Sequence, residues 1–187
     1  MGRLTLSINM SLDGFADHTL FGATADDELH DFFSGLLDIT DIELFGRNTY
    51  QLMEAYWPRA HEDPHATKST LRFADKFNAI PKVVFSKTLQ KAEWNNTRIA
   101  TSNIVDEVAI LKLRSGGNIA LGGINISKQF MKLGLIEEYW LVVHPVVAGK
   151  GTRLFEGLSE KVDLILVDTK VLKSGVVTLH YLNGKSA

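Results

Sequence analysis

The chain has 187 residues, a formal net charge of −2, and hydrophobic and charged fractions of 45% and 22%. This composition is typical of a folded globular protein and excludes wholesale disorder. The charge balance supplies no basic face for nucleic acid, and a sequence without cysteine has no thiol nucleophile, thiolate metal site or disulfide.

The apolar segments are short. The longest apolar runs, such as residues 139–143, contain five or six residues, whereas a membrane-spanning helix needs about 20. The N-terminus has no basic patch followed by an apolar stretch, as a signal peptide would have. We therefore expect a cytoplasmic protein whose partners include neither a membrane nor a nucleic acid.

Strand and helix patterns alternate along nearly the whole chain. Thr24 is expected to cap the first helix, in which Leu29, Phe33 and Leu36 lie on one apolar stripe. A polar loop is expected at 57–66. Further helices are predicted at 47–56, 67–78, 103–114 and 124–133. Strands are predicted at 4–10, 42–45, 82–86, 97–101, 118–121 and 137–143, before a terminal hairpin of 162–172 and 176–182.

This alternation predicts a single α/β domain over residues 1–187. Its sheet of about eight strands would be mostly parallel, with helices on both faces and an antiparallel C-terminal hairpin. Ligands of such open sheets bind at the carboxyl ends of the strands. The segments that follow strands are therefore the first places to look for a site.

The first such segment combines a glycine with a basic side chain. Gly46 ends a strand, and Arg47 and Thr49 begin a helix whose backbone N–H groups can bind an anion. The guanidinium adds a fork of donors suited to phosphate. The alternative is a plain strand-to-helix turn with a surface arginine.

The second segment repeats the strand–glycine–helix arrangement. Its residues are Gly122, Gly123, Ile124 and Asn125. Two glycines remove side chains where a pyrophosphate could lie on a helix start, although the usual dinucleotide fingerprint is absent. The alternative is a glycine turn required for close packing.

The third segment, Ser86, Lys87 and Thr88, offers two hydroxyls and an ammonium at a strand end. Such a cluster could hold the extra ribose phosphate of NADP, or it could be an ordinary solvated loop. The three segments together, all at strand ends of one sheet, favour a cofactor site.

A possible metal site can be set aside. Residues 61–65 match the letters of the H-E-x-x-H zinc motif, which needs both histidines on one face of a continuous helix. Pro64 would interrupt that helix. We therefore expect no metal.

In this order, the motifs resemble the dihydrofolate reductase superfamily, and more closely the reductase domain of riboflavin biosynthesis (the RibD C-terminal domain) with its stand-alone bacterial relatives. The resemblance covers nearly the whole chain. The segments that carry it are 10–14, 46–50, 86–89, 121–130, 134–138, 144–151 and 154–155.

The resemblance implies a dihydrofolate reductase-like three-layer αβα fold, a homodimer and NADPH as cofactor. It implies an NADPH-dependent reductase acting on a pyrimidine- or pterin-like heterocycle, similar to 5-amino-6-(5-phosphoribosylamino)uracil reductase. The basic residues that hold a ribosyl phosphate in the riboflavin enzyme have no counterpart here. Two alternatives are a dihydrofolate reductase and an NADPH-binding protein without turnover.

Reduction also needs a proton, from an acid or an ordered water. Asp13, in the turn after the first strand, is the first candidate, with Glu28 and Asp31 behind it. The alternative for Asp13 is that its carboxylate only bonds its own turn, as Asp before Gly often does.

Overall fold

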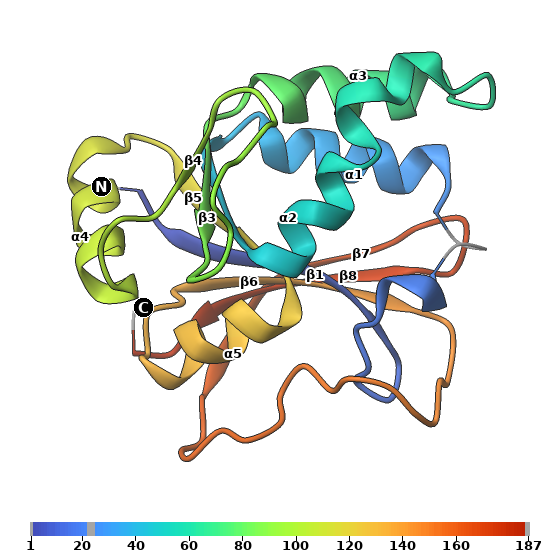
Figure 1. Ribbon diagram of the computed structural model, residues 1–187. Coiled ribbons are helices and arrows are strands. Elements are labelled where there is room, and N and C mark those ends of the chain that lie inside the picture. The colour runs from blue at the N-terminus through green and yellow to red at the C-terminus, as the bar shows by residue number, and fades with distance from the viewer. Residues whose placement is uncertain (1, 22–24, 186–187) are drawn as a thin grey trace.

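The computed structural model describes residues 2–21 and 25–185 (Figure 1). Within them, the α-helices are α1 (Asp27–Leu37), α2 (Arg47–Glu54), α3 (Lys68–Ala79), α4 (Ile104–Arg114) and α5 (Ile124–Lys132). Two short 3-10 helices are η1 (His18–Leu20) and η3 (Trp57–Glu62). The strands are β1 (Leu4–Ser11), β2 (Thr40–Gly46), β3 (Lys82–Phe85), β4 (Thr97–Ile99), β5 (Asn118–Gly122), β6 (Glu138–His144), β7 (Leu164–Val171) and β8 (Val177–Asn183).

The strands form one sheet in the order β4-β3-β2-β5-β1-β6-β8-β7. The five strand pairs from β4 to β6 are parallel, and β8 pairs antiparallel with both β6 and β7. The predicted α/β fold, mostly parallel with an antiparallel C-terminal hairpin, is confirmed. This strand order brings the carboxyl ends of β2, β5 and β1 side by side, although they are far apart in the sequence.

Helices cover both faces of the sheet, with α1 and α3 side by side over one face and α5 beneath the other (Figure 1). Side-chain alternation along β1 explains the difference between the two faces. Leu4, Leu6 and Ile8 pack in the main core with residues of α4 and α5. The intervening residues of β1 are polar and face α1, because successive side chains of a strand point to opposite faces.

Two local details differ from the sequence-based expectation. Thr24 lies outside the described residues, and the N-cap of α1 is Asp26, whose side chain accepts a hydrogen bond from the Leu29 N–H at 2.9 Å. The expected loop at 57–66 begins with η3, because proline at the first turn favours helical geometry and Trp57 packs on Phe73 with ring centroids 4.6 Å apart.

None of the described helices is long and apolar enough to cross a membrane.

Candidate active site

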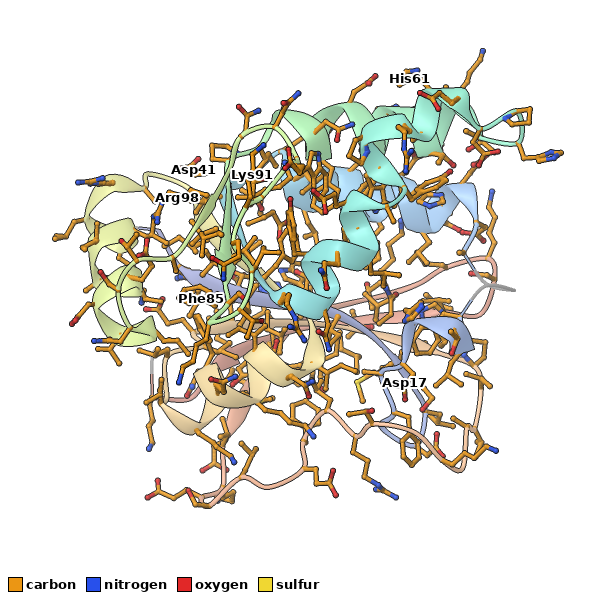
Figure 2. The ribbon with its side chains drawn as sticks, viewed as in Figure 1. Asp17, Asp41, His61, Phe85, Lys91 and Arg98 are labelled. Carbon is orange, nitrogen blue, oxygen red and sulfur yellow. The ribbon has the colours of Figure 1, made fainter. Side chains whose placement is uncertain are left out.

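A cleft of about 1270 Å³ crosses the carboxyl ends of the central strands and continues beneath α1. This volume exceeds the ~300–1,000 Å³ usual for a single-ligand pocket. Figure 2 labels two of its lining residues, Asp17 after β1 and Phe85 at the end of β3. All ten residues expected to bind a cofactor line the cleft: Gly46, Arg47, Thr49, Ser86, Lys87, Thr88, Gly122, Gly123, Ile124 and Asn125.

Two helix N-termini meet in this cleft. The N-cap residues of α2 and α5 are Gly46 and Gly123, and neither helix has a side-chain cap. Gly123 has φ +103°, and a Cβ there would lie 2.2 Å from Thr49 Oγ1 on α2. Only glycine fits this close approach, so both helix starts present bare backbone N–H groups, the arrangement that binds anions.

The loop after β3 completes this end of the cleft. The Arg47 guanidinium donates to Thr88 Oγ1 at 2.7 Å and so connects the start of α2 with the loop. Ser86 Oγ accepts from the Leu89 N–H at 2.9 Å, which holds the loop in a turn. The exposed Lys87 adds a second cation beside the two helix starts. We call this part of the cleft the cationic end.

The part of the cleft beneath α1 has a different lining. We call it the inner pocket and define it by Thr5, Ser7 and Trp140 on the sheet, Glu43 on β2, and His30 and Phe33 on α1. His30 is partly buried, and burial lowers the pKa of its imidazole against the opposing effect of nearby aspartates. In the inner pocket, polar side chains of the sheet thus lie opposite the face of α1 that carries His30 and Phe33.

Glu43 and His30 were not expected from the sequence as site residues. Glu43 is only 9% exposed, and burial raises the pKa of its carboxyl to about 8. One signal was available, because Glu43 is an acidic residue inside the apolar strand segment 42–45. Glutamate is almost never fully buried unless its carboxyl group is paired.

Comparison with known proteins identifies the family. The family model described as the RibD C-terminal domain matches residues 3–178. The chain belongs to this family. The protein YyaP of Bacillus subtilis (strain 168) is 32% identical over 183 residues, which cover 96% of this chain and 94% of YyaP. The resemblance inferred from the motifs is thus confirmed.

Two solved structures share the dihydrofolate reductase-like fold of this RibD C-terminal domain. A Shewanella sp. PV-4 protein assigned to riboflavin biosynthesis has a TM-score of 0.74 at 18% identity, covering 97% of this chain and 98% of that one. A Thermotoga maritima diaminohydroxyphosphoribosylaminopyrimidine deaminase/5-amino-6-(5-phosphoribosylamino)uracil reductase has a TM-score of 0.65 at 17% identity. The match covers 97% of this chain and 56% of the Thermotoga protein.

None of the three carboxylates considered as proton donors lines the cleft of this RibD C-terminal domain. Glu28 accepts from the Lys173 N–H at 2.8 Å, and Asp31 pairs with Arg72 on the surface at 3.0 Å. The candidate metal motif is equally remote, since His61 lies at the outer edge of the helical layer (Figure 2), bonded to Asp75 at 2.7 Å.

Asp13 holds two distant segments together. Its carboxylate accepts from Ser11 Oγ at 2.7 Å and from the N–H groups of Ala148 and Gly149 at 3.0 and 2.8 Å. These hydrogen bonds lower the pKa of Asp13 to about 2, and the hydrogen bond from Ser11 has the largest effect. A carboxyl group that is ionised at neutral pH has no proton to donate, so the contacts favour the structural role.

We expect Asp13→Asn to lower the melting temperature at neutral pH and to change any catalytic turnover little. Asparagine replaces one of the carboxylate oxygens by an NH2 group, which would face a backbone N–H donor, that of Ala148 or that of Gly149. Because the folded-state pKa lies below its ordinary value of 3.8, the stabilisation is present above pH 3.8 and is lost as pH falls toward 2. Thermal unfolding at several pH values would show the two proteins converging at low pH, whereas a 100-fold loss of turnover would assign Asp13 to catalysis.

Proposed function

We propose that the protein is an NADPH-dependent reductase that transfers hydride to a pyrimidine- or pterin-like heterocycle. The observation that carries this proposal is the meeting of two helix N-termini without side-chain caps, α2 and α5, beside Arg47 and Lys87. Family membership supports it, as does the reductase activity named for the Thermotoga protein.

The residues of the cationic end fit NADPH. The bare backbone at Gly123 lets a pyrophosphate approach the start of α5. Arg47, Ser86, Lys87 and Thr88 offer cationic and hydroxyl groups for the phosphate that distinguishes NADPH from NADH. NADPH supplies a hydride when bound, which removes the need for a protein nucleophile.

The remaining tasks fall to the chain's own side chains. The cleft is large enough to hold a second small molecule beside a dinucleotide. Leu29 and Phe33 of α1 line the cleft and pack in an apolar cluster, so their side chains would help to exclude water from the reacting centre. The polar side chains of the sheet would then orient the heterocycle.

Turnover tests the function directly. The purified protein is incubated with NADPH and a panel of oxidised pyrimidines, pterins and small quinones, and the loss of NADPH absorbance is followed. We expect reduction of at least one heterocycle. Tight NADPH binding without turnover on any compound would instead favour a cofactor-binding protein.

The chain is expected to bind NADPH at least several-fold more tightly than NADH, and Lys87→Ala is expected to reduce this preference. A charged hydrogen bond to phosphate contributes at most ~1.5–3 kcal/mol. The matched control is Lys91→Ala, because Lys91 is exposed on the same loop, pairs with Glu93 at 2.9 Å, and lies well away from Phe85 (Figure 2). Fluorescence titration measures both affinities, and equal affinities for the two cofactors would remove the phosphate role from these residues.

We also propose that the protein is a homodimer. β7 is one of the two edge strands of the described sheet, and its Ile165, Val167 and Val171 side chains are 49%, 51% and 68% exposed. Proteins usually cover such an apolar edge. Light scattering at micromolar concentration should give a dimer that Val167→Lys dissociates, whereas Leu113→Lys on α4, 77% exposed, leaves it intact. A monomeric wild type would contradict the proposal.

A further inference from the structure

The carboxyl group of Glu43 has no hydrogen-bond or ion-pair partner among the described residues, although it is nine-tenths buried and lines the inner pocket. Buried polar groups in native proteins are nearly always satisfied, and burying an unsatisfied one costs stability. An unsatisfied polar group that faces a cleft indicates that its hydrogen-bond partner belongs to a ligand.

Lys82 is the obvious alternative partner, because it is the register neighbour of Glu43 across the β2–β3 pair. Its ammonium is engaged elsewhere. Nζ donates to the carbonyl of Ile80 at 2.7 Å and lies 4.3 Å from the centroid of the Trp94 ring. The two side chains form no ion pair or hydrogen bond in the described part of the chain, so Lys82 acts on Glu43 through its charge alone and leaves the hydrogen-bonding atoms of the carboxyl group without a partner.

Two further polar atoms around the inner pocket are unsatisfied. His30 Nδ1 on the roof and Trp140 Nε1 on the floor are buried without a hydrogen-bond partner among the described residues. Both side chains line the cleft with Glu43. Three unsatisfied groups on three separate elements make a recognition site for a polar planar molecule more plausible than a packing defect at one position.

The inner pocket also lacks the means to bind phosphate. Among the described residues that line the cleft, the lysine and arginine side chains are Arg47 and Lys87, and both belong to the cationic end. A phosphorylated substrate needs such cations.

We propose that Glu43 is the substrate-recognition residue, and that it binds the lactam edge, a ring N–H beside a ring carbonyl, of a planar heterocycle that carries no phosphate. This inference rests on the proposed function. Burial raises the pKa of Glu43 to about 8, so its side chain is a carboxylic acid at neutral pH. The acid O–H donates to the ring carbonyl while the acid C=O accepts from the ring N–H, which satisfies both groups at once.

The test uses lumazine, a fluorescent fused pyrimidine-dione, with the wild type, Glu43→Gln and Glu43→Leu. Glutamine keeps one donor and one acceptor, so we expect lumazine affinity within about threefold of the wild type. Leucine keeps the volume but removes both hydrogen bonds, so we expect a loss of about tenfold or more. The N,N-dimethylated lumazine, which has no ring N–H, should bind the wild type and Glu43→Leu equally. Circular dichroism and NADPH affinity should be unchanged in both variants.

Several results would overturn the inference. Lumazine that fails to bind the wild type, or that binds Glu43→Leu as tightly, would remove Glu43 from recognition. If Glu43→Gln loses as much affinity as Glu43→Leu, the group binds as an ionised carboxylate and the lactam pairing is wrong. Normal NADPH binding in these experiments leaves the proposed function standing, whereas a wild type that binds no NADPH would overturn that function as well.

Discussion

Replacing Gly123 by valine is expected to lower the affinity for NADPH by at least about 100-fold. A Cβ at this position would lie 2.2 Å from Thr49 Oγ1 and 3.0 Å from Thr49 Cβ, so the starts of α2 and α5 must separate. Losing two charge-assisted hydrogen bonds of ~1.5–3 kcal/mol each accounts for a change of this size. Titration of NADPH fluorescence measures the affinity.

The control for this variant is Gly134→Val. Gly134 also has a positive φ, of +65°, but a Cβ there would meet nothing within 4 Å, and the residue does not line the cleft. Both substitutions strain the backbone and should cost stability, on the order of 1–2 kcal/mol. A folded Gly123→Val protein that binds NADPH as the wild type does would place the cofactor elsewhere.

The residues proposed to bind the cofactor could be brought together from the sequence because their signal is local. A glycine directly after a strand and before a helix, as at Gly46 and Gly123, marks a helix start that tolerates a close neighbour, whatever the strand order. The same holds for the caps Thr67 and Asn103, whose side chains accept hydrogen bonds from Thr70 and Asp106 N–H groups, as their sequence positions suggested.

The substrate side of the site could not be predicted in this way. The inner pocket exists because β5 lies between β2 and β1 and brings Ala120 beside Glu43 and Thr5. No local pattern encodes that order. The contacts of Asp13 could not be predicted for the same reason. Its hydrogen-bond partners Ala148 and Gly149 lie 135 and 136 residues further along the chain, and the sequence around Asp13 gives no sign of them.

Glu43→Gln is expected to make the protein more stable than the wild type, and increasingly so as pH rises from 4.5 to about 8. The folded-state pKa of Glu43, about 8, lies above its ordinary value of 4.5, because burial disfavours the charged form more than Lys82 favours it. The folded protein therefore retains a proton that the unfolded chain releases. Stability contributed by this group is present below pH 4.5 and is lost as pH rises through that window.

Glutamine does not titrate, so Glu43→Gln should escape this loss. A displaced pKa of this size corresponds to a gain on the order of a few kcal/mol by pH 8. Urea unfolding of both proteins at several pH values measures the difference, with Glu93→Gln as control, since Glu93 is exposed and already paired with Lys91 at 2.9 Å. Parallel stability curves for the wild type and Glu43→Gln would mean that the carboxyl titrates normally. A widening gap would mean that Glu43 stays protonated in the folded protein up to neutral pH, at a cost to the stability of the fold.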